Sequence, residues 1–250
     1  MTEIAAQAVR VPLTAPQAVS TTSALVWPGE DPAAAAVILA HGAGTDMHHH
    51  LMQRHAADLV AGGHAVALFN FAYTEVGRSR PDPAPRLLAA WRDVITTLGP
   101  TMGGDRPLVI GGRSMGGRMA SMLAADTGSM LGVAGVLCLA YPLHPPGRPD
   151  RLRVDHWPRL TVPALLVSGT RDAMAPGDSL RASLDAHMPP GLATLHQVAG
   201  ADHSFKVRRK DGRTQEEALA ECAQAVHAWL RQLATSERDQ SRGESGGASP

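Results

Sequence analysis

Apolar runs of strand length recur along the chain, and the segments between them carry apolar residues at helical spacing. The runs end at Ala40, Phe71, Gly112, Ala140, Gly169 and Val198. Most of them are continuously apolar, which is typical of parallel strands that are covered on both faces. Because helical segments separate the runs, we expect each connection to be a crossover. The pattern predicts an α/β fold with a mostly parallel central sheet and helices on both faces.

The spacing of apolar residues also predicts which helix faces are buried. The two central helices carry their stripes at Leu87, Trp91, Val94 and Leu98 and at Met115, Met119 and Met122. The last helix carries an apolar stripe from Leu219 to Leu233. Thr214 and Glu217 stand before that stripe at the spacing of a capping box, so we expect this helix to begin there.

The two ends of the chain show other patterns. Residues 9–27 contain two short alternating pieces, VRVPL and ALVW, which predict an antiparallel edge hairpin, although Pro12 and Pro16 disfavour strand pairing there. From Thr235 onward the chain lacks large apolar side chains, so we expect residues 235–250 to form a disordered tail. The expected organisation is a single domain over residues 1–234, with residues 1–8 held loosely.

Composition narrows the class of protein. The 250 residues are 44% apolar, enough to fill the core of one large domain. The formal charge is zero and no long Lys/Arg run occurs, so we expect neither a nucleic acid nor a membrane surface as a partner. Cys138 and Cys222 lie in apolar patterns, which favours buried thiols and a reducing compartment. The N-terminus lacks a signal-peptide pattern, so the expected localisation is cytoplasmic. The oligomeric state stays open.

One stretch carries candidate chemistry. Residues 112–116 fit the pattern G-x-S-x-G around Ser114, with a predicted strand before it and a predicted helix after it. This turn would push the serine hydroxyl out above the edge of the sheet. A phosphate-binding loop would need Lys followed by Ser or Thr after the glycines, whereas this chain has Arg118 and Met119. We therefore expect Ser114 to be a nucleophile.

A nucleophilic serine needs a base and an acid that orients the base, which follow it along the chain in the order acid, histidine. Asp172 comes directly after the strand that ends at Gly169, and His203 follows the strand that ends at Val198. Both positions lie where a parallel sheet gathers its chemistry. Asp178, by contrast, starts a helical pattern and fits a capping role better. The predicted catalytic residues are Ser114, Asp172 and His203.

The loop after the first long strand reads HGAG at residues 41–44. Its small residues would let the backbone approach a substrate. We expect the backbone N–H groups of Ala43 and Met115 to form an oxyanion hole, with His41 bracing the loop.

The sequence predicts no metal and no cofactor. His48, His49 and His50 are consecutive, and consecutive helical residues point in different directions, so they do not form a two-ligand face. No nucleotide-binding glycine pattern occupies a strand-to-helix turn.

With Ser114, Asp172, His203 and the HGAG loop in this order, the chain resembles the α/β-hydrolase superfamily over about residues 34–233. More narrowly, the chain looks like small bacterial dienelactone hydrolase-like proteins and the hydrolase-like domain of a chromatin-complex subunit of the KANSL family. The stretches that carry this narrower resemblance are HGAGTDM, FNFAYTEVGRSRPD, GGRSMGGRMASMLA, YPLHPPGRPDRLR, GTRD and GADHSF. The resemblance implies an esterase-type scaffold. Ser114 stands where dienelactone hydrolase has a cysteine, so lactone specificity is not carried over.

The sequence also suggests the shape of the substrate site. Only about twenty residues separate the strand that ends at Ala140 from the next one, which is too short for a substantial cap domain. Candidate pocket walls are Met47, His48, Tyr73, Leu143 and Trp157. A pairing of Glu75 with Arg113 near the nucleophile is left open against two unrelated solvated side chains.

The expected function is hydrolysis of a small carboxylic ester or related acyl compound through an acyl-enzyme, with a small-molecule acyl substrate as the partner. Two alternatives use the same triad, namely acyl transfer and hydrolysis of short peptides. A third, from another class, is a non-catalytic interaction module on a hydrolase scaffold.

Overall fold

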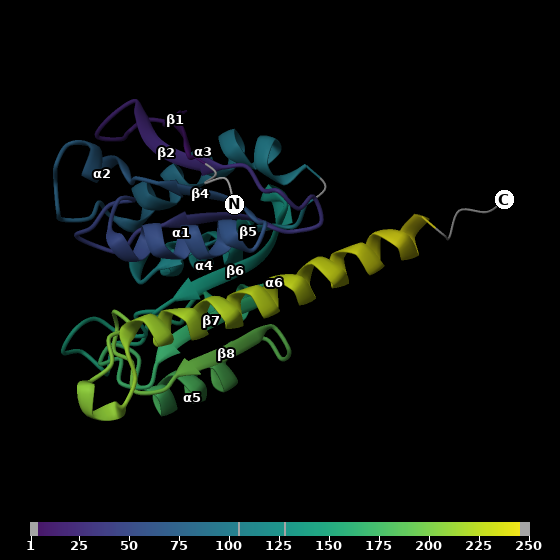
Figure 1. Ribbon diagram of the computed structural model, residues 1–250. Helices are drawn as coiled ribbons and strands as arrows, with labels where there is room; N and C mark the ends of the chain where they lie inside the picture. Colours follow the sequence, from purple (N-terminus) through teal and green to yellow (C-terminus); the bar gives the residue numbers. More distant parts are fainter. Residues whose placement is uncertain (1–4, 105, 128, 246–250) are drawn as a thin grey trace.

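A computed structural model of the chain describes residues 5–104, 106–127 and 129–245. Its centre is a sheet of eight strands in the order β1-β2-β4-β3-β5-β6-β7-β8 (Figure 1). The strands are β1 Gln7–Pro12, β2 Thr21–Trp27, β3 Ala36–Ala40, β4 Ala65–Phe69, β5 Leu108–Arg113, β6 Val133–Leu139, β7 Ala164–Gly169 and β8 Ala193–Val198. Strands β3 to β8 pair in parallel, while β2 pairs antiparallel with both β1 and β4. The predicted parallel sheet and the N-terminal edge hairpin are both confirmed.

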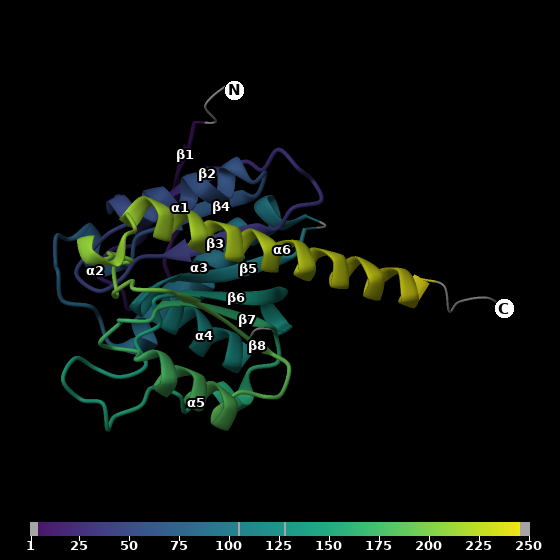
Figure 2. The same ribbon diagram turned by 60° about the horizontal axis from the view of Figure 1, so that its bottom comes forward.

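Helices cover both faces of this sheet (Figure 2). They are α1 His50–Ala61, α2 Ala72–Glu75, α3 Ala84–Gly103, α4 Met115–Thr127, α5 Gly177–His187 and α6 Gln215–Ser245. Helices α3, α4 and α5 contribute to one apolar core, and α1 and α6 contribute to the other. The connection between β6 and β7 holds only a short 3₁₀ turn, Trp157–Arg159. No separate cap domain covers the described part of the chain.

Successive side chains along each central strand point to opposite faces of the sheet, and this divides the apolar core into the two layers. In β3, Val37 and Leu39 pack toward α1 and α6, while Ile38 and Ala40 pack toward α3 and α4. All four side chains are fully buried. Burying one large aliphatic side chain contributes roughly 1.5–3 kcal/mol, and a one-residue slip would exchange the two faces. This burial fixes the register of β3, and with it the positions of the loops at the ends of the strands.

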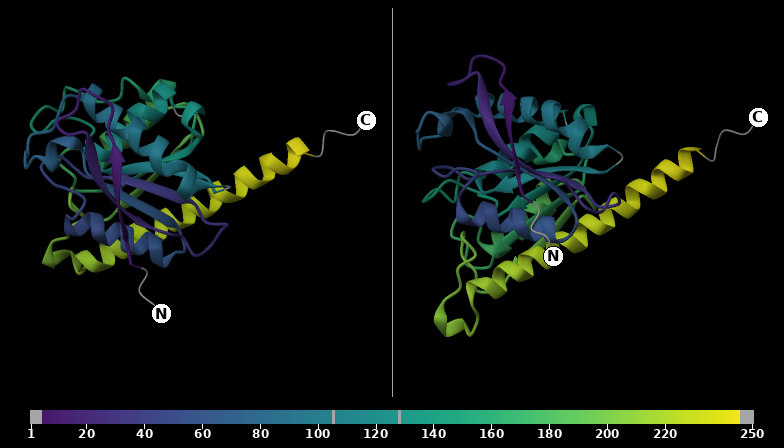
Figure 3. Two further views of the ribbon diagram at one scale, coloured as in Figure 1. Left: turned by 90° about the horizontal axis from the view of Figure 1, so that it is seen from above. Right: turned by 45° about the horizontal axis from the view of Figure 1, so that its top comes forward.

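The ends of the chain differ from expectation in two places. Gln7 and Ala8 pair with β2, so the expectation of a loose segment through residue 8 is wrong for these two. Helix α6 continues to Ser245 and extends past the sheet (Figure 3), so the expected disorder is wrong for residues 235–245. Once a packed segment has formed a helix, each further residue adds a backbone hydrogen bond without a new nucleation cost. Residues 246–250 lie outside the described residues.

The predicted capping box and the predicted burial of both cysteines are confirmed. Thr214 N–H donates to Glu217 Oε2 at 2.7 Å and Glu217 N–H donates to Thr214 Oγ1 at 3.1 Å, which is the capping box at the start of α6. Cys138 and Cys222 are free and buried, and burial raises the pKa of each thiol to about 12. Among the helices of the described chain, none has the length and apolar character that crossing a bilayer requires.

Candidate active site

The turn between β5 and α4 holds Ser114 in a backbone conformation that few residues adopt. Its φ is 51°, in the left-handed region. A Cβ on Gly116 would lie 2.1 Å from the carbonyl oxygen of Ala40, so a glycine is needed for α4 to start this close to β3. Gly112, with a φ of 149°, makes the same approach to Ala40. The turn therefore has the strained form that the G-x-S-x-G pattern predicts.

His203 and Asp172 lie at the same edge of the sheet as Ser114, because they follow β8 and β7. Nε2 of His203 lies 3.0 Å from Oγ of Ser114, and Nδ1 of His203 lies 2.7 Å from Oδ2 of Asp172. With the imidazole proton on Nδ1 and donated to the carboxylate, Nε2 can accept the serine proton. The structure thus brings the three predicted residues together in hydrogen-bonding order.

Further contacts fix the acid and the histidine in place. The side chain of Asp172 is fully buried, and its Oδ1 accepts a hydrogen bond from the N–H of Met174 at 2.8 Å. Nη2 of Arg113 donates to the carbonyl oxygen of His203 at 3.1 Å and to Oγ of Ser204 at 3.0 Å. Burial lowers the pKa of Arg113, and nearby carboxylates oppose that shift. Arg113, the last residue of β5, therefore ties the loop of His203 to the strand that ends beside Ser114.

The loop after β3 is braced by His41, as predicted. Nδ1 of His41 donates to the carbonyl oxygen of Gly42 at 2.8 Å, and its Nε2 accepts from the N–H of Phe71 at 3.2 Å. Burial lowers the pKa of His41 to about 4, which keeps the ring neutral near pH 7. Ala43 and Met115 both line the cavity beside Ser114. Met115 is the first residue of α4, so its N–H has no acceptor within that helix.

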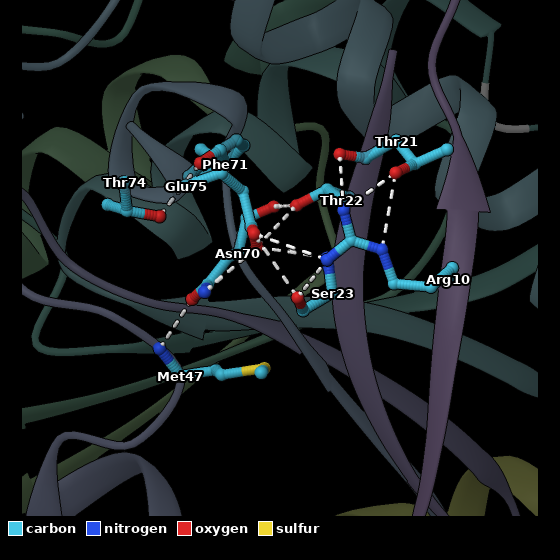
Figure 4. A network of polar contacts seen from close by, with 9 residues as sticks. All are labelled: Arg10, Thr21, Thr22, Ser23, Met47, Asn70, Phe71, Thr74 and Glu75. Carbon is cyan, nitrogen blue, oxygen red and sulfur yellow. Dashed lines mark hydrogen bonds and ion pairs between the residues drawn. The ribbon is translucent and has the colours of Figure 1, made fainter. Parts of the chain in front are cut away.

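A polar network connects this loop to the edge of the sheet (Figure 4). Oδ1 of Asn70 accepts from the N–H of Met47 at 2.9 Å, and Nδ2 of Asn70 donates to Oε1 of Glu75 at 3.1 Å. The same carboxylate oxygen accepts from the N–H of Ser23 at 2.9 Å and from Oγ1 of Thr22 at 3.2 Å. The loop that carries Ala43 is therefore held to β2 through two side chains.

Glu75 does not pair with Arg113. Its ion pair is with Arg10, at 3.3 Å between Nη1 and Oε2, while Arg113 is engaged with the loop of His203. Burial raises the pKa of Glu75, but its hydrogen bonds from Ser23, Asn70 and Thr22 outweigh that effect and leave the pKa below its ordinary value. Sequence reasoning missed the role of Asn70. The available signal was a polar residue inside the apolar run HAVALFNF.

A cavity of about 470 Å³ lies beside Ser114 and His203. Its walls come from the start of α3, the start of α4 and the connection between β6 and β7. Apolar side chains form part of the lining, namely those of Leu87, Met119, Pro142, Pro146 and Met174. A cavity of this volume suits a small molecule, and Ser114 forms part of its lining.

Residues 33–231 match the sequence profile of the alpha/beta hydrolase domain family. The chain belongs to this family. Solved structures with the same fold include a dienelactone hydrolase from Anabaena variabilis, with a TM-score of 0.70, 20% identity and coverage of 91% of this chain and 97% of that one. An alpha-beta serine hydrolase homologue from Coxiella burnetii has a TM-score of 0.69 and 17% identity, and the match covers 92% of this chain and 98% of that one. A serine hydrolase without a lid from Xanthomonas campestris has a TM-score of 0.65 and 20% identity, and the match covers 92% of this chain and 97% of that one.

The predicted pocket walls are not those of the hydrolase cavity. Met47, Tyr73, Leu143 and Trp157 are buried in the apolar cores, and His48 is exposed outside the cavity. Large apolar side chains at the start of a loop gain more by packing against the sheet than by lining an open site. Within the described parts of this hydrolase, no group of three or more His, Cys, Asp or Glu side chains is placed to hold a metal ion.

Proposed function

We propose that this hydrolase cleaves a small carboxylic ester through an acyl-enzyme on Ser114. The observation that carries the proposal is the continuous hydrogen-bonded chain from Ser114 through His203 to Asp172, next to a cavity of about 470 Å³. A serine in this arrangement is activated by its neighbouring base. Each partner is also held by a further contact, so the geometry is set before a substrate binds.

The reaction proceeds in two balanced halves. Oγ of Ser114 forms a bond to the acyl carbon while His203 takes the serine proton and then delivers it to the departing alcohol, whose bond to the acyl carbon breaks. Water then attacks the acyl-enzyme, with His203 as the base, and the acid is released as the serine regains its proton. The N–H groups of Ala43 and Met115 stabilise the oxyanion in both halves, each contributing about 3 kcal/mol.

The alternatives make different demands on the site. Acyl transfer and cleavage of short peptides use the same three residues and differ in the acceptor or the bond that is cleaved. An interaction module does not require a serine in hydrogen-bond contact with a histidine. The intact contact at 3.0 Å favours catalysis over that module.

Steady-state kinetics on matched ester, thioester and amide substrates test the proposal. We expect kcat/KM for short-chain esters to exceed that for the amides by orders of magnitude. Activity should be abolished in Ser114→Ala and reduced about 10³- to 10⁴-fold in Asp172→Asn, because an asparagine no longer fixes the imidazole tautomer. Asp178→Asn, exposed in the first turn of α5, is the matched control. Amide turnover equal to ester turnover would favour the peptidase alternative.

A further inference from the structure

The active-site cavity concentrates positive charge, although the whole chain has a formal charge of zero. Arg113, Arg118 and Arg153 line it, with Asp82 as the carboxylate among the lining residues. Oδ1 of Asp82 already accepts from Arg78 at 3.1 Å, and its Oδ2 is buried with no hydrogen-bond partner among the described residues, so neither oxygen bonds to Arg118 or Arg153. Arg113 is engaged in positioning the loop of His203, as described above. The side chains of Arg118 and Arg153, by contrast, do not position any part of the described site.

Neither of these two arginines forms an ion pair within the described chain, and Nε of Arg118 is buried without a hydrogen-bond partner. The two charges also act on each other: burial lowers the pKa of Arg153, and the positive charge of Arg118 lowers it further. Charged groups that are partly removed from water are normally paired. Two like charges facing one cavity therefore lack a counter-ion that an anionic ligand would supply.

Backbone hydrogen bonds hold the main chain of both arginines in place. Arg118 stands one helical turn after the nucleophile, with its N–H bonded to the carbonyl oxygen of Ser114 at 3.0 Å. Arg153 is held from both sides, because its N–H donates to Leu143 O at 2.8 Å and its carbonyl oxygen accepts from Oη of Tyr141 at 2.6 Å. Residues one turn apart on a helix have their Cβ atoms about 5–6 Å apart. Arg118 and Ser114 also line the same cavity of about 470 Å³, so a ligand group held by Arg118 would lie within the length of one small molecule from a carbonyl at Ser114.

We propose that Arg118 and Arg153 form an anion subsite, which selects small esters that carry a second, negatively charged group a few bonds from the scissile carbonyl. This inference rests on the proposed function, whose substrate class it narrows. The charged group is a carboxylate or a phosphate, both of which a guanidinium binds through paired hydrogen bonds. The hydrocarbon between the two groups lies against the apolar lining around Met119 and Leu87.

The test compares monoethyl glutarate with ethyl pentanoate, a neutral analogue that has a methyl group in place of the carboxylate, by titrating the acid released. We expect kcat/KM of the wild type to favour the anionic ester by about tenfold or more, as one charge-assisted hydrogen bond allows. Arg118→Gln and Arg153→Gln should each lower that ratio about tenfold, while Arg118→Lys and Arg153→Lys should keep part of it. Arg148→Gln removes one positive charge from the exposed part of the same loop, outside the cavity lining, and should keep the wild-type ratio.

A second measurement uses only the wild type, in case a glutamine variant fails to fold. Glutarate or inorganic phosphate should inhibit hydrolysis of ethyl pentanoate competitively, and the neutral diamide glutaramide should not. The stronger of the two inhibitors identifies the anion. Inhibition should weaken as salt is added, because screening reduces the attraction.

The outcomes separate this inference from the proposed function. If a fluorophosphonate labels Ser114 and ethyl pentanoate is hydrolysed as well as the anionic ester, with no inhibition by either anion, the subsite is overturned and the proposed function stands. If Ser114 is not labelled and neither ester is hydrolysed by folded protein, the proposed function is overturned, and the subsite with it.

Discussion

At the scale of single residues, the site depends on side chains that never touch a substrate. Asn70 is one of them, since it accepts from Met47 in the loop of Ala43 and donates to Glu75. Its relative exposure is 9%, so its hydrogen bonds form with little competition from water. A donor aimed at an oxyanion is effective only while its position is held to a fraction of an ångström. Asn70 is therefore a positioning residue for the proposed oxyanion hole.

Replacing Asn70 with alanine leaves the N–H of Met47 and the Glu75 carboxylate each without one partner. We expect kcat for a short-chain ester to fall by about 10- to 100-fold, with a smaller change in KM, because the oxyanion forms in the transition state. Thr74→Ala, which removes a hydroxyl that bonds to Phe71 O in the neighbouring turn, is the control and should keep kcat within about twofold. Equal losses in both variants, or none in Asn70→Ala, would show that the network does not position the loop.

At the scale of elements, the decisive feature is how closely α4 approaches β3. A side chain at residue 116 would meet the carbonyl oxygen of Ala40, whereas one at residue 103, at the end of α3, would meet no atom within 4 Å. The close approach sets where Ser114 stands above the sheet edge. The packing of α4 against β3 therefore determines the position of Ser114, the proposed nucleophile.

These two glycines make a matched pair. Gly116→Ala should lower the free energy of unfolding by about 3 kcal/mol, at the upper end of the cost of overpacking, and reduce labelling of Ser114. Gly103→Ala should be neutral or stabilise by up to about 1 kcal/mol, because alanine is the better helix former. Denaturant unfolding of both variants measures the difference. A Gly116→Ala protein as stable and reactive as the wild type would contradict the packing account.

Sequence patterns predict the elements well, and they also indicate that the three proposed catalytic residues share one edge of the sheet, because both depend on order along the chain. Each apolar run becomes a strand, and Ser114, Asp172 and His203 follow the ends of three parallel strands that share one edge. The cavity walls depend instead on packing between distant segments. Trp157, which we expected in the cavity wall, therefore lies in the core. Arg118 and Arg153 line the cavity because tertiary structure brings their segments together, which no local sequence pattern indicates.

At the scale of the whole molecule, burial strongly changes the titration of four histidines in the folded state. Burial lowers the pKa of His41, His64 and His156 to about 4 and that of His55 to about 3. An unfolded histidine has a pKa near 6.5. Below that pH the unfolded chain binds protons that the folded protein excludes, so stability is full above about pH 6.5 and is lost as the pH falls toward 4.

The free energy of unfolding should therefore decrease between pH 7 and pH 5, where carboxylates stay ionised, by up to about 1.4 kcal/mol per pH unit for each buried histidine. His156→Gln, which keeps a partner for Ser121, should make this dependence shallower by one histidine's share. His187→Gln, at the half-buried end of α5, is the control. Denaturant titrations at several pH values provide the curves, and a flat profile in the wild type would contradict this account.

The account of the whole molecule depends on one claim, that the fold activates Ser114 through His203. The most direct measurement is intact mass spectrometry after treatment with a fluorophosphonate, on the wild type, Ser114→Ala and His203→Ala, with Ser79→Ala and His48→Ala as exposed controls. We predict a single adduct that maps to Ser114, absent in the first two variants and retained in both controls. Folded wild-type protein without an adduct, or an adduct that persists in Ser114→Ala, would contradict the claim.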